Sequence, residues 1–234
     1  MAIFNPKAIG LLCLSFFFFR PVVSEDQVTF MQEFCSEKQF DHGSVYQSNL
    51  NVLLANLSNE AVSKKFYNFT VGNSVNKVYG LFLCNGAYTA QCMLRYANHS
   101  IFSIVDDSVH FDFDYGPRVY QQFDQQLSSM LIGLFNKAIV DNTSLASALG
   151  VVYVRETISL AGYVDCTPDL SPYDCNRCLQ SGLSRLPMNG RQLGTTALPS
   201  CRLSYFYIDV SPGKRFGASQ VNHLLKYEFY SYIV

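Results

Sequence analysis

Three cysteines lie close together in the second half of the chain. Cys166, Cys175 and Cys178 form a C-x8-C-x2-C pattern, and Cys201 follows further on. Thiols in such a cluster support one of two chemistries: they pair as disulfides in an oxidising compartment, or their thiolates bind zinc in a reducing one. The compartment therefore decides what this cluster does.

The N-terminus has the three parts of a secretory signal peptide. Lys7 supplies a positive charge, residues 9–19 form an apolar run, and residues 22–24 offer a small-residue cleavage site. This run is shorter than the roughly 20 apolar residues that cross a bilayer, and no later stretch is long and apolar enough. We predict a signal peptide over residues 1–24 and an exported chain without a membrane span; an uncut signal anchor is the alternative. Disulfides are then expected in place of a metal site.

The composition is that of a globular protein with a proper core. Hydrophobic residues make up 49% of the chain, and the net charge of -1 argues against the clustered basic face that nucleic-acid binding needs. Four N-x-S/T sequons are candidate glycosylation sites, at Asn56, Asn68, Asn98 and Asn142.

No residue pattern predicts catalysis. The histidines are scattered outside metal and nucleophile signatures, at His42, His99, His110 and His223. Residues 105–114 contain Asp106, Asp107, Asp112 and Asp114, which suggest paired catalytic carboxylates or a calcium site. The alternation of apolar and acidic residues there is more typical of a strand and linker with a solvated face. We therefore expect no catalytic residue, no metal and no cofactor.

The elements that must position the cysteines occur twice. In each copy a β-like apolar run has a glycine four residues before a cysteine, at Gly80 and Cys84 and again at Gly162 and Cys166. A C-x-L-x-Y segment follows each run, beginning at Cys92 and at Cys201. An amphipathic helical pattern precedes each run. Its apolar positions are Tyr46, Leu50, Leu53, Leu54 and Leu57 in the first copy, and Phe123, Leu127, Met130, Leu131, Leu134 and Phe135 in the second.

The two copies differ by one helix. Cys84 and Cys92 are 8 positions apart, whereas Cys166 and Cys201 are 35 positions apart. The additional residues predict a helix in the second copy only.

This additional helix has clear boundaries in the sequence. Ser171 is placed to cap it, Pro172 takes its first position, and Asp174 completes an S-x-x-D capping pattern. Cys175 and Cys178 then lie one turn apart on one helix face. One of them can reach the end of the preceding strand and the other can reach across to a further strand.

These motifs resemble the ginkbilobin-homologous, or stress-antifungal, domain. Residues 165–180 and 198–201 are similar to the second copy of a tandem pair, and residues 34–36, 46–50 and 92–102 are similar to the first. Such pairs make up plant cysteine-rich repeat secretory proteins and the ectodomains of cysteine-rich receptor-like kinases. The resemblance implies an α+β fold with two tandem units, each with helices packed on an antiparallel sheet of about five strands, the first unit missing its second helix. The expected units span residues 28–105 and 112–212, and residues 213–234 form an atypical tail.

The resemblance also implies a disulfide pairing, Cys166 with Cys175 and Cys178 with Cys201. The family's partners of Cys35, Cys84 and Cys92 lie in the absent helix and the segment after it, so these thiols are expected to be unpaired or of uncertain pairing. A Cys84–Cys92 bridge is conceivable because each lies near a strand end. Of the 8 cysteines, Cys13 leaves with the signal peptide, and the odd number that remains requires at least one thiol that is free or joined to another chain.

The same resemblance sets the functional expectation. The family's antifungal member resembles a mannose-binding lectin, but its polar residues are replaced here by Ser36, Ala97 and Phe206, and Arg191 lies ten residues before the last cysteine. Mannose binding is therefore not expected. We predict a secreted, non-enzymatic protein of the apoplast that recognises an unidentified extracellular protein or carbohydrate ligand in defence or stress, with a disulfide-linked or non-covalent dimer allowed. The alternatives are a truncated ectodomain of a cysteine-rich receptor-like kinase and, third, a small secreted hydrolase.

Overall fold

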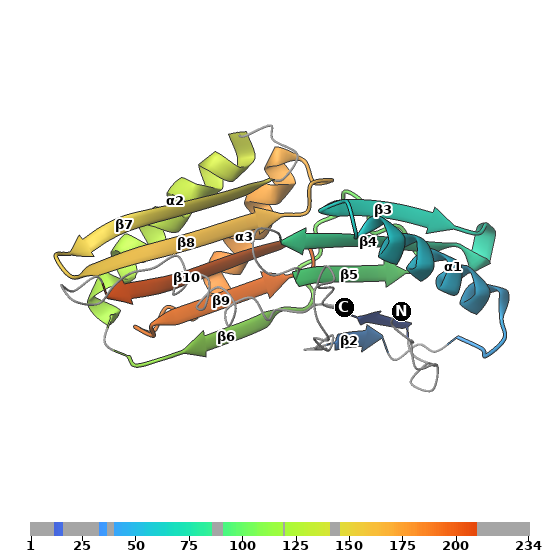
Figure 1. Cartoon of the computed structure of the whole chain (residues 1–234), viewed down its shortest axis with the longest axis horizontal. Helices are drawn as coiled ribbons and strands as arrows, with labels where there is room; N and C mark the ends of the chain where they lie inside the picture. The colour runs from blue at the N-terminus through green and yellow to red at the C-terminus, as the bar shows by residue number, and fades with distance from the viewer. Residues whose placement is uncertain are drawn as a thin grey trace.

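Two antiparallel sheets lie side by side in the computed structural model of the chain (Figure 1). The structure describes residues 12–15, 33–36, 40–85, 91–118, 120–140 and 146–209. One sheet has 3 strands in the order β3-β4-β5, and the other has 5 strands in the order β6-β9-β10-β8-β7. The fold is therefore α+β, as the sequence predicts.

The three-stranded sheet packs against one helix. Its elements are α1 (Val45–Glu60), β3 (Phe66–Val71), the 3-10 turn η2 (Ser74–Asn76), β4 (Val78–Asn85) and β5 (Gln91–Ala97). The hydroxyl of Ser44 caps α1 by accepting a hydrogen bond from the Gln47 backbone N–H at 3.2 Å. The buried face of α1 is the predicted one, with Tyr46, Leu50, Leu53 and Leu57 in the core.

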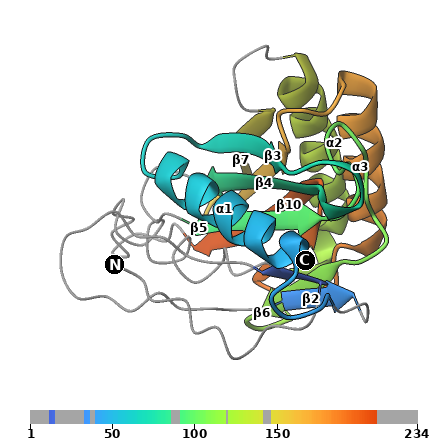
Figure 2. The same ribbon diagram turned by 90° about the vertical axis from the view of Figure 1, so that its right-hand side faces the viewer.

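The five-stranded sheet carries two helices on one face. Its elements are β6 (Phe111–Tyr115), the 3-10 turn η3 (Gln121–Phe123), α2 (Asp124–Val140), β7 (Ser147–Arg155), β8 (Ile158–Cys166), α3 (Pro172–Arg185), β9 (Leu193–Leu198) and β10 (Cys201–Asp209). Figure 2 shows α2 and α3 together on the same side of the molecule. The predicted apolar face of α2 is in the core, with Leu127, Leu131, Leu134 and Phe135 buried.

The helix difference between the copies is present in the structure. β4 ends at Asn85 and β5 begins at Gln91, so the connection is too short for a helix of the length of α3, and Cys84 lies directly opposite Cys92 in an antiparallel pair. In the other sheet α3 fills the corresponding connection. Ser171 caps α3 through the Asp174 backbone N–H at 3.1 Å, and Pro172 is its first residue, as predicted. The expected sheet of about five strands is found once; the first sheet has 3 strands among the described residues.

A further short pair of strands lies near the N-terminus. β1 (Leu12–Ser15) pairs antiparallel with β2 (Glu33–Ser36). Because β1 lies inside the predicted signal peptide, cleavage after residue 24 would remove it from the mature protein and leave β2 without this partner.

The repeated glycines explain how each helix approaches its sheet. A Cβ on Gly80 would lie 2.6 Å from Cδ2 of Leu53 in α1. A Cβ on Gly162 would overlap Cε of Met130 in α2. In both units the glycine therefore lets the helix pack directly on the strand that leads to the cysteine.

Candidate functional site

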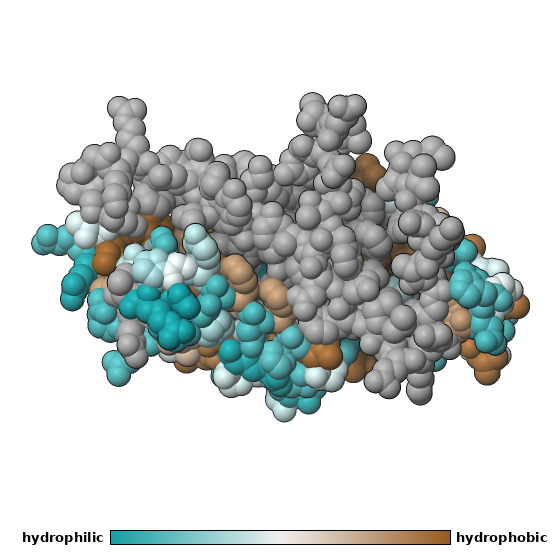
Figure 3. Space-filling model, turned by 90° about the horizontal axis from the view of Figure 1, so that it is seen from below, coloured by the Kyte–Doolittle hydropathy of each residue, from teal (hydrophilic) through white to brown (hydrophobic). Residues whose placement is uncertain are grey.

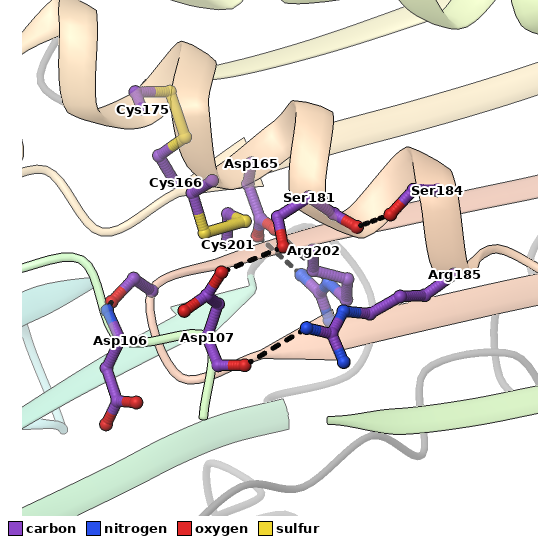
Figure 4. Close-up of a disulfide and its surroundings, with 12 residues drawn as sticks. Asp106, Asp107, Asp165, Cys166, Cys175, Ser181, Ser184, Arg185, Cys201 and Arg202 are labelled. Carbon is purple, nitrogen blue, oxygen red and sulfur yellow. Dashed lines mark hydrogen bonds and ion pairs between the residues drawn. A yellow bond between two sulfur atoms is a disulfide. The ribbon is translucent and has the colours of Figure 1, made fainter. Parts of the chain in front are cut away.

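Two disulfides fasten α3 to the five-stranded sheet. Cys166 at the end of β8 is joined to Cys175, and Cys178 is joined to Cys201 at the start of β10, with Cα separations of 5.7 and 6.0 Å. These separations lie in the usual range for a disulfide. Figure 4 shows the first bridge at the N-terminal end of α3. The four cysteines are buried, so the helix and both strand ends form one covalently braced corner.

Cys84 corrects one expectation about the first unit. The structure has Cys84 in a disulfide, so it is not an orphan thiol. The short hairpin that replaces the helix has the Cα atoms of Cys84 and Cys92 in register, where directly opposed residues are about 4.5 to 5.5 Å apart. The side chains of Cys35 and Cys92 lie outside the described residues.

A buried arginine occupies the junction between the two sheets. Arg95 comes from β5, and its Nη2 lies 2.7 Å from Oδ2 of Asp106 in the connection that follows. The Arg95 side chain is 4% exposed. Burial lowers the pKa of the Arg95 guanidinium, and the charges of Asp106 and Asp169 oppose that effect. Because an unpaired buried charge is costly, Asp106 is required to neutralise Arg95 in the folded chain.

The same arginine reaches the second sheet through Ser200. Ser200 lies in the turn between β9 and β10, and its Oγ is 3.5 Å from Nη1 of Arg95. This hydroxyl accepts a hydrogen bond from the Asp106 backbone N–H at 3.1 Å and donates one to the Ile104 carbonyl at 3.2 Å. Close by, the Ser103 backbone N–H donates to Oδ2 of Asp169 at 2.6 Å. We call Arg95, Ser103, Asp106, Asp169 and Ser200 the junction.

Apolar contacts run through the junction as well. Met93 of β5 packs against the core of the five-stranded sheet and also against the cluster of Leu81, Ala97 and Ile101 in the first sheet. Val105 of the connection packs against the second core. Charge and apolar packing thus hold the two sheets together at the same place.

The acidic stretch is not simply a solvated face. Its second part is strand β6, as the alternation predicts, but each carboxylate accepts a hydrogen bond from another segment. Oδ2 of Asp107 accepts from Ser181 of α3 at 3.0 Å, and Oδ1 of Asp112 accepts from Thr196 of β9 at 2.9 Å. Oδ2 of Asp114 accepts from Asn189 at 3.2 Å. These bonds fix the connection between the sheets onto the second unit.

Arg185 of α3 adds to the same contact. Its Nη2 donates to the Asp107 carbonyl at 3.4 Å, and its Nη1 lies 2.8 Å from Nδ1 of His110. Nε2 of His110 is 3.5 Å from Oδ2 of Asp112. His110 therefore has a structural place between α3 and β6, and Figure 4 shows Asp107 facing Ser181 and Arg185.

A second ion pair lies on the sheet face opposite the helices. Nη2 of Arg202 is 2.5 Å from Oδ2 of Asp165, directly across the β8–β10 pair. The Tyr163 hydroxyl donates to the same oxygen at 3.1 Å. Burial, together with the Asp165 charge, raises the pKa of Tyr163, which keeps its hydroxyl protonated as a donor.

Three of the positions compared with the mannose site have structural roles in the described residues. Arg191 donates to the Gly116 carbonyl at 2.8 Å and lies 3.4 Å from Asp114, so it holds the end of β6. Phe206 is buried in the five-stranded sheet and Ala97 in the first sheet. The side chain of Ser36 lies outside the described residues.

The candidate glycosylation sites have different surroundings. Asn98 is exposed just after β5, whereas Asn68 is half-buried on β3. Asn56 lies within α1 and donates to the Val52 carbonyl at 2.8 Å. Asn142 lies outside the described residues.

The described residues contain neither a metal-binding cluster nor a membrane-spanning helix. No group of three His, Cys, Asp or Glu side chains in the described ranges is arranged to hold a metal ion. None of the helices described here combines the length and the apolar character that a bilayer crossing requires.

Comparisons of sequence place the chain among known proteins. The model for the salt stress response/antifungal family matches residues 34–100. Cysteine-rich repeat secretory protein 1 of Arabidopsis thaliana is 27% identical over 215 residues, which cover 76% of this chain and 63% of that protein. Putative cysteine-rich receptor-like protein kinase 20 of the same plant is 28% identical, over 87% of this chain and 37% of the kinase. The chain thus spans less than two thirds of the length of either relative.

Solved structures agree on the fold. The tandem DUF26 ectodomains of the Arabidopsis thaliana cysteine-rich receptor-like proteins PDLP5 and PDLP8 match with TM-scores of 0.55 and 0.56 at 21% identity. Each match covers 74% of this chain, and 96% and 95% of the two ectodomains. The chain therefore carries a salt stress response/antifungal domain, has the fold of a tandem DUF26 ectodomain, and is related to cysteine-rich repeat secretory proteins and cysteine-rich receptor-like kinases.

Proposed function

We propose that this chain is a secreted, non-enzymatic recognition protein of the apoplast that acts in defence or stress response. The observation that carries the proposal is the disulfide-braced corner of α3, because disulfides persist in oxidising compartments and are rare in the cytosol. The names of the relatives, secretory proteins and receptor-like kinases, support the same compartment.

In this proposal the two units over residues 28–105 and 112–212 act as one recognition body. The junction supports this because the buried Arg95 of the first sheet pairs with Asp106 of the connection and contacts Ser200 beside the second sheet. Figure 3 shows hydrophilic and hydrophobic residues mixed on the described part of one face of the molecule. The partner is an extracellular protein or a carbohydrate other than mannose.

The covalent features of the mature protein belong to the proposal. We assign disulfides to Cys166 with Cys175 and to Cys178 with Cys201, and glycans to the sequons, with Asn98 the most accessible of those described.

Expression of the full chain in plant cells tests export. We expect the protein in the culture medium, shortened at its N-terminus and lowered in mass by deglycosylation, while a variant that starts at Met-Glu25 stays inside the cell. Retention of the full chain with all thiols reduced would contradict the proposal.

Binding tests the recognition role. The purified, fluorescently labelled protein is expected to bind plant protoplasts or isolated cell walls in a saturable way, in competition with unlabelled protein. The Cys178→Ala/Cys201→Ala variant is the matched control, since it loses the brace without changing the charge. Protease treatment of protoplasts distinguishes a protein ligand from a carbohydrate one. Absence of saturable binding to both preparations would overturn the recognition role.

The second candidate is the truncated ectodomain of a receptor-like kinase. This candidate is favoured by the alignment of 87% of this chain with only 37% of a cysteine-rich receptor-like kinase, as expected for part of a longer receptor. Transcript sequencing separates the two: kinase exons continuing downstream support the receptor, and a stop codon in every transcript supports the secreted form. A hydrolase would require turnover that survives purification and is lost on mutation of a named polar residue.

A further inference from the structure

The strands of the two sheets correspond to each other except at one place. β4 and β8 carry the repeated glycine and cysteine, and β5 and β10 carry the C-x-L-x-Y segment. β4 lies between β3 and β5, as β8 lies between β7 and β10. β10 pairs on its other side with β9, whereas β5 is the last strand of its sheet among the described residues. The first sheet therefore lacks a counterpart of β9.

The missing strand belongs to the same gap in the chain as the missing helix. In the second unit α3 and β9 both lie between Cys166 and Cys201. In the first unit Cys84 and Cys92 are only 8 positions apart, which leaves room for neither element. Backbone N–H and C=O groups along the edge of a sheet pair readily with an added strand. The edge of β5 is therefore a place where such a strand is expected.

The structure has β1 at this edge. β1 (Leu12–Ser15) contacts β5 and pairs antiparallel with β2 (Glu33–Ser36). β9 pairs antiparallel with β6 in the same way in the second unit. Figure 1 shows the dark-blue arrow of β1 between β5 and β2, as the strand order has β9 between β10 and β6. β1 thus takes the position that β9 has in the complete unit.

Cleavage of the predicted signal peptide would take this strand away. Residues 12–15 lie within residues 1–24, so a mature chain that begins at Glu25 keeps β2 and β5 but loses β1. Among the described strands that remain, only β4 pairs with β5. Cleavage therefore leaves a place one strand wide between β5 and β2, which we call the strand slot.

The residues of β1 and β9 indicate what the strand slot accepts. In β1 the large apolar Leu12 and Leu14 alternate with the small Cys13 and Ser15. β9 has leucines at its two ends and only glycine, threonine and alanine between them, and it is buried along its whole length. Neither strand contains a charged residue or a proline. An extended, uncharged segment with small residues therefore fits, and its backbone makes the pairing.

We propose that the exported protein binds an extended, uncharged segment of another extracellular protein as an added strand in the strand slot. This inference rests on the proposed export and cleavage, and it selects a protein ligand over a carbohydrate. A second copy of the chain does not fit in the same way. An edge strand of a second copy keeps its own sheet on one side, so it cannot enter between two strands, and β2 contains the charged Glu33.

A labelled copy of the β1 segment is the probe. A fluorescent peptide of residues 11–16 with Cys13→Ser, flanked by lysines for solubility, is titrated into the mature chain of residues 25–234. We expect saturable binding. The same peptide with Leu14→Pro should bind at least about tenfold more weakly, because proline removes a backbone donor and disfavours a strand. Bound peptide should slow hydrogen exchange in β5 and leave β7, an edge strand of the other sheet, unchanged.

A chain whose slot is already filled is the control protein. Residues 11–16 with Cys13→Ser, joined through a flexible linker to Glu25, should raise the melting temperature and abolish binding of the free peptide. Equal binding of the proline peptide, or equal binding by the filled chain, would overturn the proposal. A folded mature chain that does not bind the peptide would overturn it as well.

A second preparation covers the case in which the mature chain alone does not fold. The full chain with Cys13→Ser and a protease site after Ser24 is folded first and then cleaved. We expect the released segment to co-elute with the protein and to exchange with the labelled peptide. Loss of the segment, or a segment that does not exchange, would overturn the proposal.

These results are distinct from a failure of the proposed function. Retention of the uncleaved chain inside the cell contradicts export, whereas an exported protein that binds protoplasts but not the peptide loses only this inference. Light scattering of the mature chain tests the remaining occupant. A monomer supports the proposal, and a dimer that the peptide dissociates would place a second copy in the slot and overturn it.

Discussion

Nη2 of Arg95 and Oδ2 of Asp106 lie 2.7 Å apart, and the arginine of this pair is 4% exposed. The pair belongs to neither sheet alone, because Arg95 is on β5 and Asp106 is in the connection that leads to β6. The buried positive charge of the first sheet is therefore compensated by a residue of the connection to the second sheet.

We expect Asp106→Asn to destabilise the protein by about 2 to 3 kcal/mol, because it leaves the Arg95 charge buried without a counter-charge. Urea unfolding followed by circular dichroism measures the loss. Arg95→Met/Asp106→Leu removes both charges and is expected to recover part of it. Glu60→Gln, in the exposed Glu60–Lys64 pair, is the control and leaves the midpoint unchanged. An Asp106→Asn midpoint equal to that of Glu60→Gln would refute the role of the pair.

The two disulfides are expected to contribute comparably to stability. In the chain-entropy model the Cys178–Cys201 bridge, with a separation of 23, is worth about 3 kcal/mol, and the Cys166–Cys175 bridge, with a separation of 9, slightly less. Double alanine variants of each bridge, unfolded in urea, measure these values. Peptide mapping of the unreduced protein should show both linkages, and other partners for these cysteines would remove the basis for the braced corner.

Glycine-to-alanine changes separate close packing from helix propensity. Gly80→Ala and Gly162→Ala place a methyl group against Leu53 and Met130, so we expect each to cost about 1 to 3 kcal/mol. Gly133 lies in α2 with no atom near an added Cβ, and Gly133→Ala should stabilise the protein by about 0.5 to 1 kcal/mol. Thermal unfolding of the three variants is the measurement. A stabilising Gly80→Ala would show that the helix does not contact the strand as described.

Hydrogen exchange is expected to be faster in residues 28–105 than in residues 112–212. Among the described residues the first sheet has 3 strands and one helix, whereas the second has 5 strands and two helices, one of which is fastened to the sheet by two disulfides. Amide exchange read by mass spectrometry of peptides tests this directly. Equal and strong protection in both regions would refute this expectation.

Stability should fall at alkaline pH through buried tyrosines. Burial raises the pKa of Tyr46 to about 12, above the ordinary value near 10, and also raises the pKa of Tyr205 and Tyr207. The folded state therefore holds these protons more tightly than the unfolded state. This contribution to stability is complete below pH 10 and is lost as the pH rises towards 12.

Tyr46→Phe isolates one of these groups. Within the described structure the Tyr46 hydroxyl has no hydrogen-bond partner, so its removal is expected to be tolerated. The variant should gain stability relative to wild type between pH 10 and pH 12 in urea unfolding. Tyr173→Phe, at a residue 75% exposed, is the control and should show no such gain. A pH-independent difference for Tyr46→Phe would contradict the burial effect.

The sequence predicts the helices because they follow local rules, whereas the pairing of the four cysteines is implied by the resemblance to the stress-antifungal domain. Apolar residues that recur with a period of 3.6 indicate α1 and α2. Ser171 as cap and Pro172 as first position predict the first residue of α3 correctly. The sequence also predicts that the first unit lacks the second helix, because the short spacing between Cys84 and Cys92 limits the length of the connection between them.

The junction could not be predicted in the same way. Arg95 is a charged residue in a strand, and the residue pattern of that strand does not indicate that its side chain is buried. Its contact Ser200 is 105 residues away in the sequence. The roles of Asp107, Asp112 and Asp114 likewise depend on partners in α3, on β9 and in the segment between them. Pairings of this kind are set by tertiary packing, which a local pattern does not contain.

The distance in sequence between Arg95 and its contacts also sets an order of events during synthesis. The short hairpin of β4 and β5 closes through neighbouring residues, and Asp106 leaves the ribosome 11 residues after Arg95. Ser200 emerges 105 residues later, at the other end of the second unit. During synthesis the contact between Arg95 and Ser200 can therefore form only after nearly the whole polypeptide has left the ribosome, and until then this side of the guanidinium stays solvated.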